Sequence, residues 1–282
     1  MNNNYHLKIA DISVCINSPV DLFVSSCCGP FITDQSNLID ITYDYQIGLP
    51  LAEHELIHKM DPVIHKSGNG YLVEREHLGK CCSCVYLEKP YKRIPAWIYP
   101  ENEKRFTSLQ TLLGVSELEI PLSASGIFNL HSSVIKINNK TILFSAPSGT
   151  GKSTQANLWE KSRCADIING DRALIRKKNG LWTAYGSPFA GSSEIYRNEN
   201  APIQTVVVLE QAPYNEIDEL TPAKAFRHIY AETIIPRWNN EIHLALMDLL
   251  TDFVREVKIV KLRCLPDQSA VDLLDNYMNR EI

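Results

Sequence analysis

The 282-residue chain has no apolar run long enough to cross a bilayer, since runs such as Val206–Leu209 fall far short of the roughly 20 residues that a spanning helix needs. It also lacks an excess of positive charge, with a net charge of −5 and no lysine- or arginine-rich stripe to follow a nucleic-acid backbone. The N-terminus lacks the charged-then-apolar layout of a signal peptide. We therefore expect a cytoplasmic protein with neither nucleic acid nor membrane as a partner.

Internal repeats and low-complexity linkers are absent as well. The composition, 44% hydrophobic and 22% charged, is that of ordinary globular material with room for two modest domains. Residues 1–123 read as a β-rich N-terminal domain that carries no nucleotide signature and could present an acceptor. Its expected strands fall at 5–16, 40–47, 70–73, 84–88 and 93–99, with a helix at 108–113.

Residues 124–282 alternate strands with helices, which predicts an α/β domain. An Asn138-Asn139 turn joins apolar strands into a first hairpin, and an Asn179-Gly180 turn marks a second. Thr221-Pro222 has the N-cap and first-turn proline of a helix start. The remaining expected elements are strands at 165–169, 204–210 and 257–265 and helices at 153–162, 221–234, 241–255 and 269–278.

The most informative motif follows the first hairpin, where a β-rich strand meets a glycine-punctuated turn and then a helical pattern. Polyphosphate offers only acceptor oxygens, so its binding site must supply N–H donors, and glycines let the backbone turn its N–H groups inward. The helix N-terminus adds donors and a positive dipole end. Lys152 would reach the phosphates, and Ser153 would bind Mg²⁺. The predicted nucleotide-binding residues are Ser148, Gly149, Thr150, Gly151, Lys152, Ser153 and Thr154.

Phosphoryl transfer also needs a base and a carboxylate near the metal. Asp171 follows the strand at 165–169, which we expect beside the loop strand, and is the candidate base. Glu194 closes a Gly/Ser/Pro-rich loop and is the candidate magnesium ligand together with Ser153. His131, just before the first hairpin strand, could lie near the transferred phosphate. The alternatives are a turn-capping Asp171, a solvated Glu194 and a structural His131.

These residues together resemble the catalytic domain of HPr kinase/phosphorylase, which is related to the phosphoenolpyruvate carboxykinase fold. The resemblance extends well over residues 131–194. It implies that Asp171 accepts the proton, that Glu194 binds magnesium and that His131 acts beside them. It also implies self-association, because HPr kinases are hexamers. The fold expected is therefore an HPr-kinase-like P-loop catalytic domain with a β-rich N-terminal domain.

The chain departs from that family at two positions of its motifs. Ala146 stands where the loop pattern has its first glycine, and Gly170 stands where HPr kinases have the first of two aspartates. The N-terminal part does not resemble that of HPr kinases. The chain is more similar to stand-alone relatives that phosphorylate a serine of a precursor peptide, which implies an ATP- and Mg²⁺-dependent kinase with a peptide, protein or small molecule as its hydroxyl-bearing acceptor.

Other readings stay open at this point. His54-Glu55-Leu-Ile-His58 matches the zinc-hydrolase helix pattern of two histidines with a general base between them. Cys81, Cys82 and Cys84, with Cys27-Cys28, offer thiolates for a metal, although in a cytoplasmic chain free thiols are the simpler expectation. A nucleotide-binding regulator without transfer activity is the main alternative to a kinase.

Overall fold

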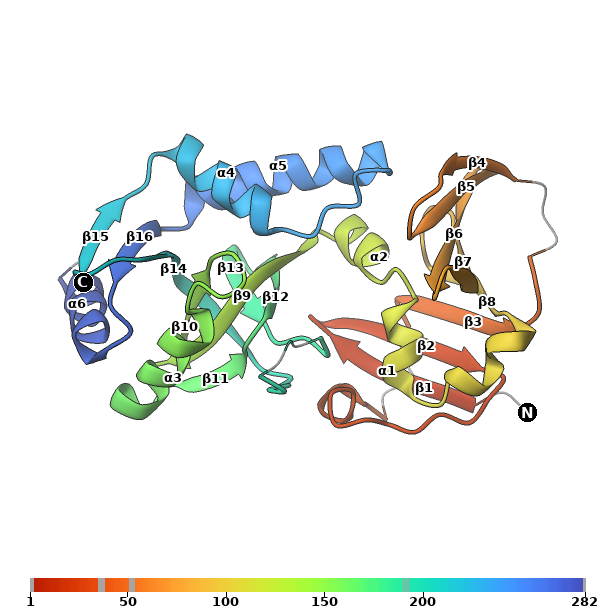
Figure 1. The fold of residues 1–282 in the computed structure, drawn as a ribbon, viewed down its shortest axis with the longest axis horizontal. Coiled ribbons are helices and arrows are strands. Elements are labelled where there is room, and N and C mark those ends of the chain that lie inside the picture. The colour runs from red at the N-terminus through yellow and green to blue at the C-terminus, as the bar shows by residue number, and fades with distance from the viewer. Residues whose placement is uncertain (1–2, 35–38, 51–53, 190, 192, 281–282) are drawn as a thin grey trace. The chain divides into compact units, whose positions relative to one another are not determined.

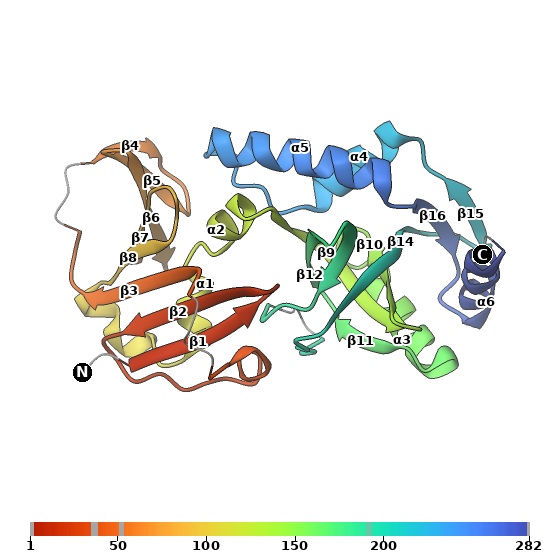
Figure 2. The same ribbon diagram turned by 180° about the vertical axis from the view of Figure 1, so that it is seen from behind.

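The computed structural model describes residues 3–34, 39–50, 54–189, 191 and 193–280. The chain forms two compact units, Met1–Ser125 and Gly126–Ile282, each with its own eight-stranded sheet (Figures 1 and 2). The architecture is thus mixed α/β. Within these ranges, no helix combines the length and the apolar character needed to cross a membrane.

The first unit is one sheet with the strand order β1-β2-β3-β8-β7-β6-β5-β4. Its pairs are antiparallel except where β3 lies parallel to both β2 and β8. The strands are β1 (Asn3–Ile9), β2 (Ile12–Ser18), β3 (Ile41–Ile47), β4 (Glu55–His58), β5 (Val63–Ser67), β6 (Gly70–His77), β7 (Lys80–Leu87) and β8 (Arg93–Ile98). The helical segments are η1 (Gly29–Phe31), η2 (Pro100–Arg105), α1 (Leu109–Gly114) and α2 (Glu119–Ala124).

The expected single strand over residues 5–16 is in fact two strands. Ala10 and Asp11 both adopt positive φ, 49° and 64°, and turn the chain back on itself so that β1 and β2 pair as a hairpin. Two residues in the left-handed region make the turn that best matches the twist of the flanking strands. The alternating pattern was correct, but the turn within it was missed.

The zinc-hydrolase helix is wrong. Residues Glu55–His58 form the edge strand β4, which pairs with β5. Along an extended chain, His54 and His58 are about 13 Å apart at roughly 3.3 Å per residue, whereas two ligands of one zinc must each approach it within about 2.1 Å. A segment between Pro50 and Pro62 is short for a helix, because the first turn of a helix is costly to nucleate.

The second unit is built around two long strands that each pair with three other strands of its sheet. Its elements are β9 (Ile127–Ile137), β10 (Lys140–Ser145), α3 (Lys152–Arg163), β11 (Asp166–Asn169), β12 (Arg172–Lys178), β13 (Leu181–Tyr185), β14 (Asn200–Gln211), β15 (Glu216–Glu219), α4 (Pro222–Glu232), α5 (Asn240–Glu256), β16 (Ile259–Cys264) and α6 (Gln268–Asn279). The strand order is β10-β9-β12-β13-β14-β16-β15, and β10 also pairs with β14, which closes a ring of five strands.

Strand β9 changes partners halfway along its length. Its first half pairs with β12, and the last pair in that ladder joins His131 to Arg172. From Ser132 onward it pairs with β10. Strand β11 also pairs with β9, so the expectation that it lies beside the loop strand β10 is wrong. Strand β9 pairs with both β10 and β11, so the segment before Asp171 still lies only one strand away from the strand that leads into the loop.

Both expected hairpins of this unit are present, and each has a two-residue turn. Asn138 and Asn139 have φ of 49° and 59°, and Asn179 and Gly180 have φ of 49° and 81°. Asparagine and glycine tolerate this left-handed region better than other residues do. The turns therefore fix the register of β9 with β10 and of β12 with β13.

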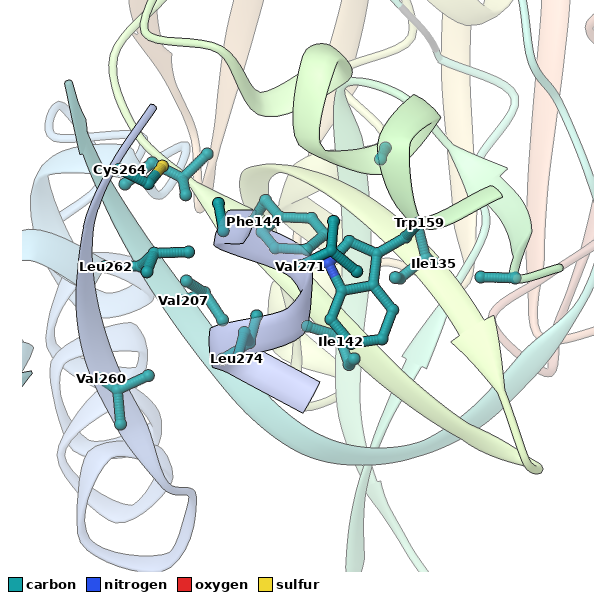
Figure 3. Packing of buried hydrophobic residues seen from close by; sticks show 14 of the residues in the cluster. Ile135, Ile142, Phe144, Trp159, Val207, Val260, Leu262, Cys264, Val271 and Leu274 are labelled. Carbon is teal, nitrogen blue, oxygen red and sulfur yellow. The ribbon is translucent and has the colours of Figure 1, made fainter. Parts of the chain in front are cut away.

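An apolar core joins strands β10, β14 and β16 to helices α3 and α6. Figure 3 shows Trp159 of α3 packed near Phe144 of β10 and Val271 of α6, all of them fully buried. Strand β10 is buried along almost its whole length, which explains its continuous apolar run. This packing holds the C-terminal end of β10, and thus the loop that follows it, against a rigid support.

Candidate functional site

The glycine-punctuated loop joins β10 to α3 as expected. Gly149 and Gly151 adopt positive φ of 80° and 112°, a backbone conformation that residues other than glycine rarely take. Gly151 is the N-cap of α3, so the helix begins at Lys152 with its free N–H groups facing the loop. The loop thus has the concave, donor-rich backbone that an anion requires.

Lys152 is folded inward over this loop and is only 7% exposed. Its Nζ donates to the carbonyl oxygens of Ala146 at 2.8 Å and Pro147 at 3.3 Å. Burial lowers the pKa of the ammonium group, and the charges of Glu232 and Asp171 act in the opposite direction. A cation held near the loop by backbone carbonyls alone is well placed to exchange them for a stronger anionic partner.

Asp171 is fixed by the turn between β11 and β12. The side-chain oxygen of Asn169, which is fully buried, accepts the backbone N–H groups of Asp171 at 2.9 Å and Arg172 at 2.8 Å. The Asn169 amide in turn donates to the carbonyls of Ser187 and Phe189, which ties this turn to the loop after β13. The Asp171 carboxylate is therefore presented by a hydrogen-bonded turn and not by a free loop.

His131 connects Asp171 to the carboxylate of Glu232, a residue that the sequence analysis did not identify. Its Nε2 is 3.1 Å from Oδ1 of Asp171, and its Nδ1 is 3.0 Å from Oε2 of Glu232. Ionised carboxylates only accept hydrogen bonds, so both contacts are made when the ring carries two N–H groups or when one carboxyl is protonated. The second Asp171 oxygen is 3.1 Å from Nε of Arg172. The site is a row of alternating acidic and basic side chains, Glu232, His131, Asp171 and Arg172.

A second histidine supports the start of the loop. His228 of α4 lies with Nε2 3.1 Å from Oγ of Ser145, and that hydroxyl donates to the carbonyl of His131 at 3.2 Å. Burial lowers the pKa of His228, opposed by the charge of Glu232. Helix α4 thus contacts both the last residue of β10 and the His131 ring.

One cavity of about 380 Å³ brings these groups together, and we call it the loop cavity. It contains polar groups from the loop, from the first turn of α3 and from the Asp171 turn. Its lining residues are His131, Ser148, Gly149, Gly151, Lys152, Ser153, Thr154, Gly170, Asp171 and Ser193. Of the residues predicted from the sequence, only Thr150 and Glu194 are outside this lining.

Glu194 is exposed and adopts a positive φ of 50°. Its neighbour Ser193 lines the loop cavity, so the segment comes close to the site although the Glu194 side chain itself does not contribute to the lining. Two residues of the predicted loop over 186–194, Ala190 and Ser192, are outside the described residues. The magnesium role of Glu194 stays a prediction.

Gly170 stands where the resemblance noted in the sequence would place an aspartate, and the structure shows why a side chain does not fit there. A Cβ atom built there would be 2.3 Å from Oγ and 2.4 Å from Cβ of Ser193. Gly191 likewise passes close to Asp171, because a Cβ at that position would be 3.1 Å from the Asp171 Cγ. The segment after β13 therefore packs directly on the Asp171 turn where a second carboxylate would otherwise sit.

Glu232 and His228 were missed because their contacts depend on how α4 docks. Glu232 is 101 residues from His131 in the chain, and no local pattern links the two. One signal was available, since Glu232 is the last residue of α4. A carboxylate is disfavoured at the negative end of a helix dipole, so its presence there indicates a nearby cation.

The candidate thiolate cluster of the first unit lies within one strand. Cys81, Cys82 and Cys84 lie in β7, and no group of three histidine, cysteine or acidic residues suited to a metal occurs among the described residues. Burial raises the pKa of Cys81 to about 11 and that of Cys28 to about 12, so both thiols stay protonated near neutral pH.

Comparisons with known proteins give little beyond this geometry. No protein-family model and no curated protein matches the chain. Among solved structures, the chain is similar to the HPr(Ser) kinase/phosphatase from Coxiella burnetii, with 11% sequence identity and a TM-score of 0.24. The match covers 44% of this chain and 95% of that one. A TM-score this low does not establish a shared fold.

Proposed function

We propose that this protein is an ATP- and Mg²⁺-dependent phosphotransferase that moves the γ-phosphate of ATP to a hydroxyl group, most simply a serine of a peptide or protein. The observation that supports it is the loop cavity, where a glycine-turned loop, a buried lysine and a histidine–aspartate pair face one space. A generic nucleotide switch needs the loop and the lysine but has no evident use for a positioned base.

The chain's donors fit the triphosphate part of the substrate. Gly149 and Gly151 shape the backbone so that N–H groups at the start of α3 are available to phosphate oxygens. Lys152 would give up its bonds to the Ala146 and Pro147 carbonyls and donate to the β- and γ-phosphates. Charge-assisted bonds of this kind are roughly twice as strong as bonds to neutral carbonyls.

The same cavity suits a magnesium ion. Mg²⁺ commonly takes one or two protein oxygens and completes its octahedron with substrate phosphates and water. The exposed Ser153 hydroxyl lines the loop cavity and would supply one of these oxygens. When bound, the ion would neutralise charge on the phosphates. Glu194 enters this set only as a prediction.

Asp171 is the proposed base. The acceptor oxygen forms a bond to the γ-phosphorus while the bond from that phosphorus to the bridging β–γ oxygen breaks, and ADP leaves with the electron pair. The acceptor's proton passes to a free lone pair of the Asp171 carboxylate. His131 and Arg172 hold that carboxylate from two sides and fix its direction.

The acceptor is proposed to bind through the β-rich first unit, residues 1–125. Among the described residues, this unit contributes none to the lining of the loop cavity. Peptide, protein and small-molecule acceptors all supply the required hydroxyl.

Asp171→Asn is the decisive variant. Transfer from γ-labelled ATP to candidate acceptors should fall by at least about a hundredfold while ATP binding persists, because the amide cannot take the proton. Asp166→Asn is the matched control, since Asp166 lies at the other end of β11 and pairs with Arg197 outside the loop cavity. Bound nucleotide without transfer to any hydroxyl acceptor in the wild type would favour a regulator.

A further inference from the structure

The sheet of the first unit ends in two edge strands, β1 and β4, and only β1 is partly covered. Along β1, the backbone N–H of Thr33 donates to the His6 carbonyl at 2.9 Å, and Ile32 bridges Leu7. Strand β4 pairs with β5 on one side and lies at the rim of the sheet (Figures 1 and 2). On its other side, the backbone of Glu55–His58 makes no hydrogen bond to the described part of the chain. This edge therefore offers N–H and C=O groups to another extended chain.

The side chains of β4 would reinforce such pairing. Leu56 and Ile57, in the middle of the strand, are 48% and 47% exposed. Edge strands are usually protected from pairing by charged residues or proline, whereas here the central residues are apolar. Because successive residues of a strand point to opposite faces, an added chain meets an apolar side chain on each face of the sheet.

Glu55 adds a negative charge to this edge. It is exposed and makes no ion pair within the described ranges. Its cross-strand neighbour is Lys66, but the Lys66 ammonium lies 4.3 Å from the centre of the Tyr71 ring. Residues 1–125 contain 15 aspartates and glutamates but 10 lysines and arginines, whereas residues 126–282 contain 18 of each kind, so the first unit carries the whole net charge of −5. The charge of this unit favours a basic partner.

We propose that β4 docks the acceptor as an extended peptide that adds a strand to the sheet, with an apolar residue beside Leu56 and a lysine or arginine beside Glu55. This inference rests on the proposed function, because it takes the docked chain to be the acceptor of the phosphate. Main-chain hydrogen bonds to a sheet edge supply affinity, and alternate side chains supply specificity. Glu55 and Leu56 are consecutive, so the residues that face them are consecutive too, and the docked segment alternates apolar and basic residues.

The length of the edge favours a peptide over a second copy of this chain. The four residues of β4 extend about 13 Å at roughly 3.3 Å per residue. A contact between two β4 edges would use about four residues from each copy, whereas a stable interface has roughly 20–30 residues a side. A short edge gives a weak and reversible contact, and a substrate that must leave after transfer needs no more.

The first test measures fluorescence anisotropy of a labelled peptide, Ser-Gly-Val-Lys-Val-Lys-Val-Gly, with the full chain. One comparison peptide is N-methylated throughout the Val-Lys segment, and another has glutamate for lysine. The probe should bind at least about tenfold more tightly than either, because the first loses its N–H donors and the second brings like charge to Glu55. Glu55→Lys should reverse the preference between the lysine and glutamate peptides. Glu101→Lys, the same charge change at an exposed residue of η2, should keep it.

A second pair of variants tests the apolar contact. Leu56→Ser should weaken the probe at least about threefold, whereas Leu78→Ser, which removes a 90% exposed leucine outside β4, should change it by less than about 1.5-fold. Because Glu55 and Leu56 are both exposed, these variants should fold, and circular dichroism checks that they do.

Equal binding of the probe and its N-methylated form, or equal effects of Glu55→Lys and Glu101→Lys, overturns the inference and leaves the proposed function standing. A dimer in sedimentation that Leu56→Ser dissociates also overturns it, since the edge then pairs with a second copy. The proposed function is measured separately, by calorimetry with ATP alone. A wild type that does not bind ATP overturns that function, and with it the acceptor role of the docked peptide, whatever the probe does.

Discussion

His131 and Asp171 are forty residues apart in the chain, yet Nε2 of the histidine lies 3.1 Å from Oδ1 of the aspartate. The contact exists because His131 is the last residue of β9 that pairs with β12, and Asp171 immediately precedes β12. The backbone N–H of Ser132 donates to the Asp171 carbonyl at 3.0 Å and locks the two segments together. The pair is thus set by strand register and not by a flexible loop.

Glu232 should matter through His131. Glu232→Gln replaces the carboxylate beside Nδ1 of His131 with a neutral amide. The His131 ring, and the Asp171 carboxylate that it contacts, are then held less firmly in place. We expect kcat for transfer to fall about tenfold with little change in KM for ATP. The nitrogen-15 shifts of the His131 ring should also move, which a merely structural role would not require.

Glu219→Gln is the control for that variant, because it makes the same charge change on exposed strand β15. Glu232→Asp should restore part of the rate. Wild-type kinetics in Glu232→Gln, with an unchanged His131 spectrum, would remove Glu232 from the proposed mechanism.

Lys152→Met should weaken ATP binding while leaving the stability of the fold nearly unchanged. Burial lowers the pKa of Lys152, which means that the site disfavours the charged form when only the protein surrounds it. We therefore expect the free energy of unfolding to change by less than about 1 kcal/mol. ATP affinity should fall at least about tenfold, because the charge-assisted bonds to phosphate are lost. Thermal denaturation and calorimetry measure the two effects, and normal ATP affinity would contradict the role assigned to this lysine.

Gly170→Ala should destabilise the protein because its Cβ would overlap Ser193. The expected loss is about 1–3 kcal/mol in the free energy of unfolding, typical of overpacking. Gly114→Ala provides the contrast, since a Cβ there meets nothing within 4 Å and should be neutral or stabilising. Adding Ser193→Gly to Gly170→Ala should recover stability, and a double mutant no better than the single one would argue against this packing.

His228 should make stability sensitive to mild acid. Burial lowers its pKa in the folded state, so as pH falls below about 6.5, the ordinary value, the unfolded chain takes up the proton first. The free energy of unfolding of the wild type should therefore fall more between pH 7.5 and 5.5 than that of His228→Gln. Urea titrations of both proteins at the two pH values test this, and parallel losses would show that His228 does not contribute.

Local signals in the sequence predicted much of the second unit. The Asn138-Asn139 turn, the buried strand β10 and the glycine-rich loop are each specified by residues within a few positions of one another. Helix α3 spans Lys152–Arg163, one residue longer at each end than the expected 153–162. The same local reasoning failed at β4, where a five-residue match suggested a helix and pairing with β5 decided otherwise.

The parts that could not be predicted depend on contacts between distant segments. Pairing of β11 with β9, docking of α4 on His131 and the approach of Ser193 to Gly170 all follow from packing of the whole unit. No periodicity in the sequence encodes such pairings. The candidate residues were therefore found in part, while their supports, Glu232, His228 and Asn169, emerged only from the structure.

Strand β9 pairs with β12 over its first half and with β10 over its second half, which makes it intolerant of changes in length. A one-residue insertion before His131 would shift its pairing with β12 or with β10, and every side chain beyond the insertion would turn to the opposite face. An extra residue in the Asn179-Gly180 turn, by contrast, falls at an exposed hairpin end, where a three-residue loop can still join β12 to β13 without moving the rest of the ladder. In a collection of natural or engineered variants, insertions and deletions should accumulate at such turns and be excluded from residues 127–137.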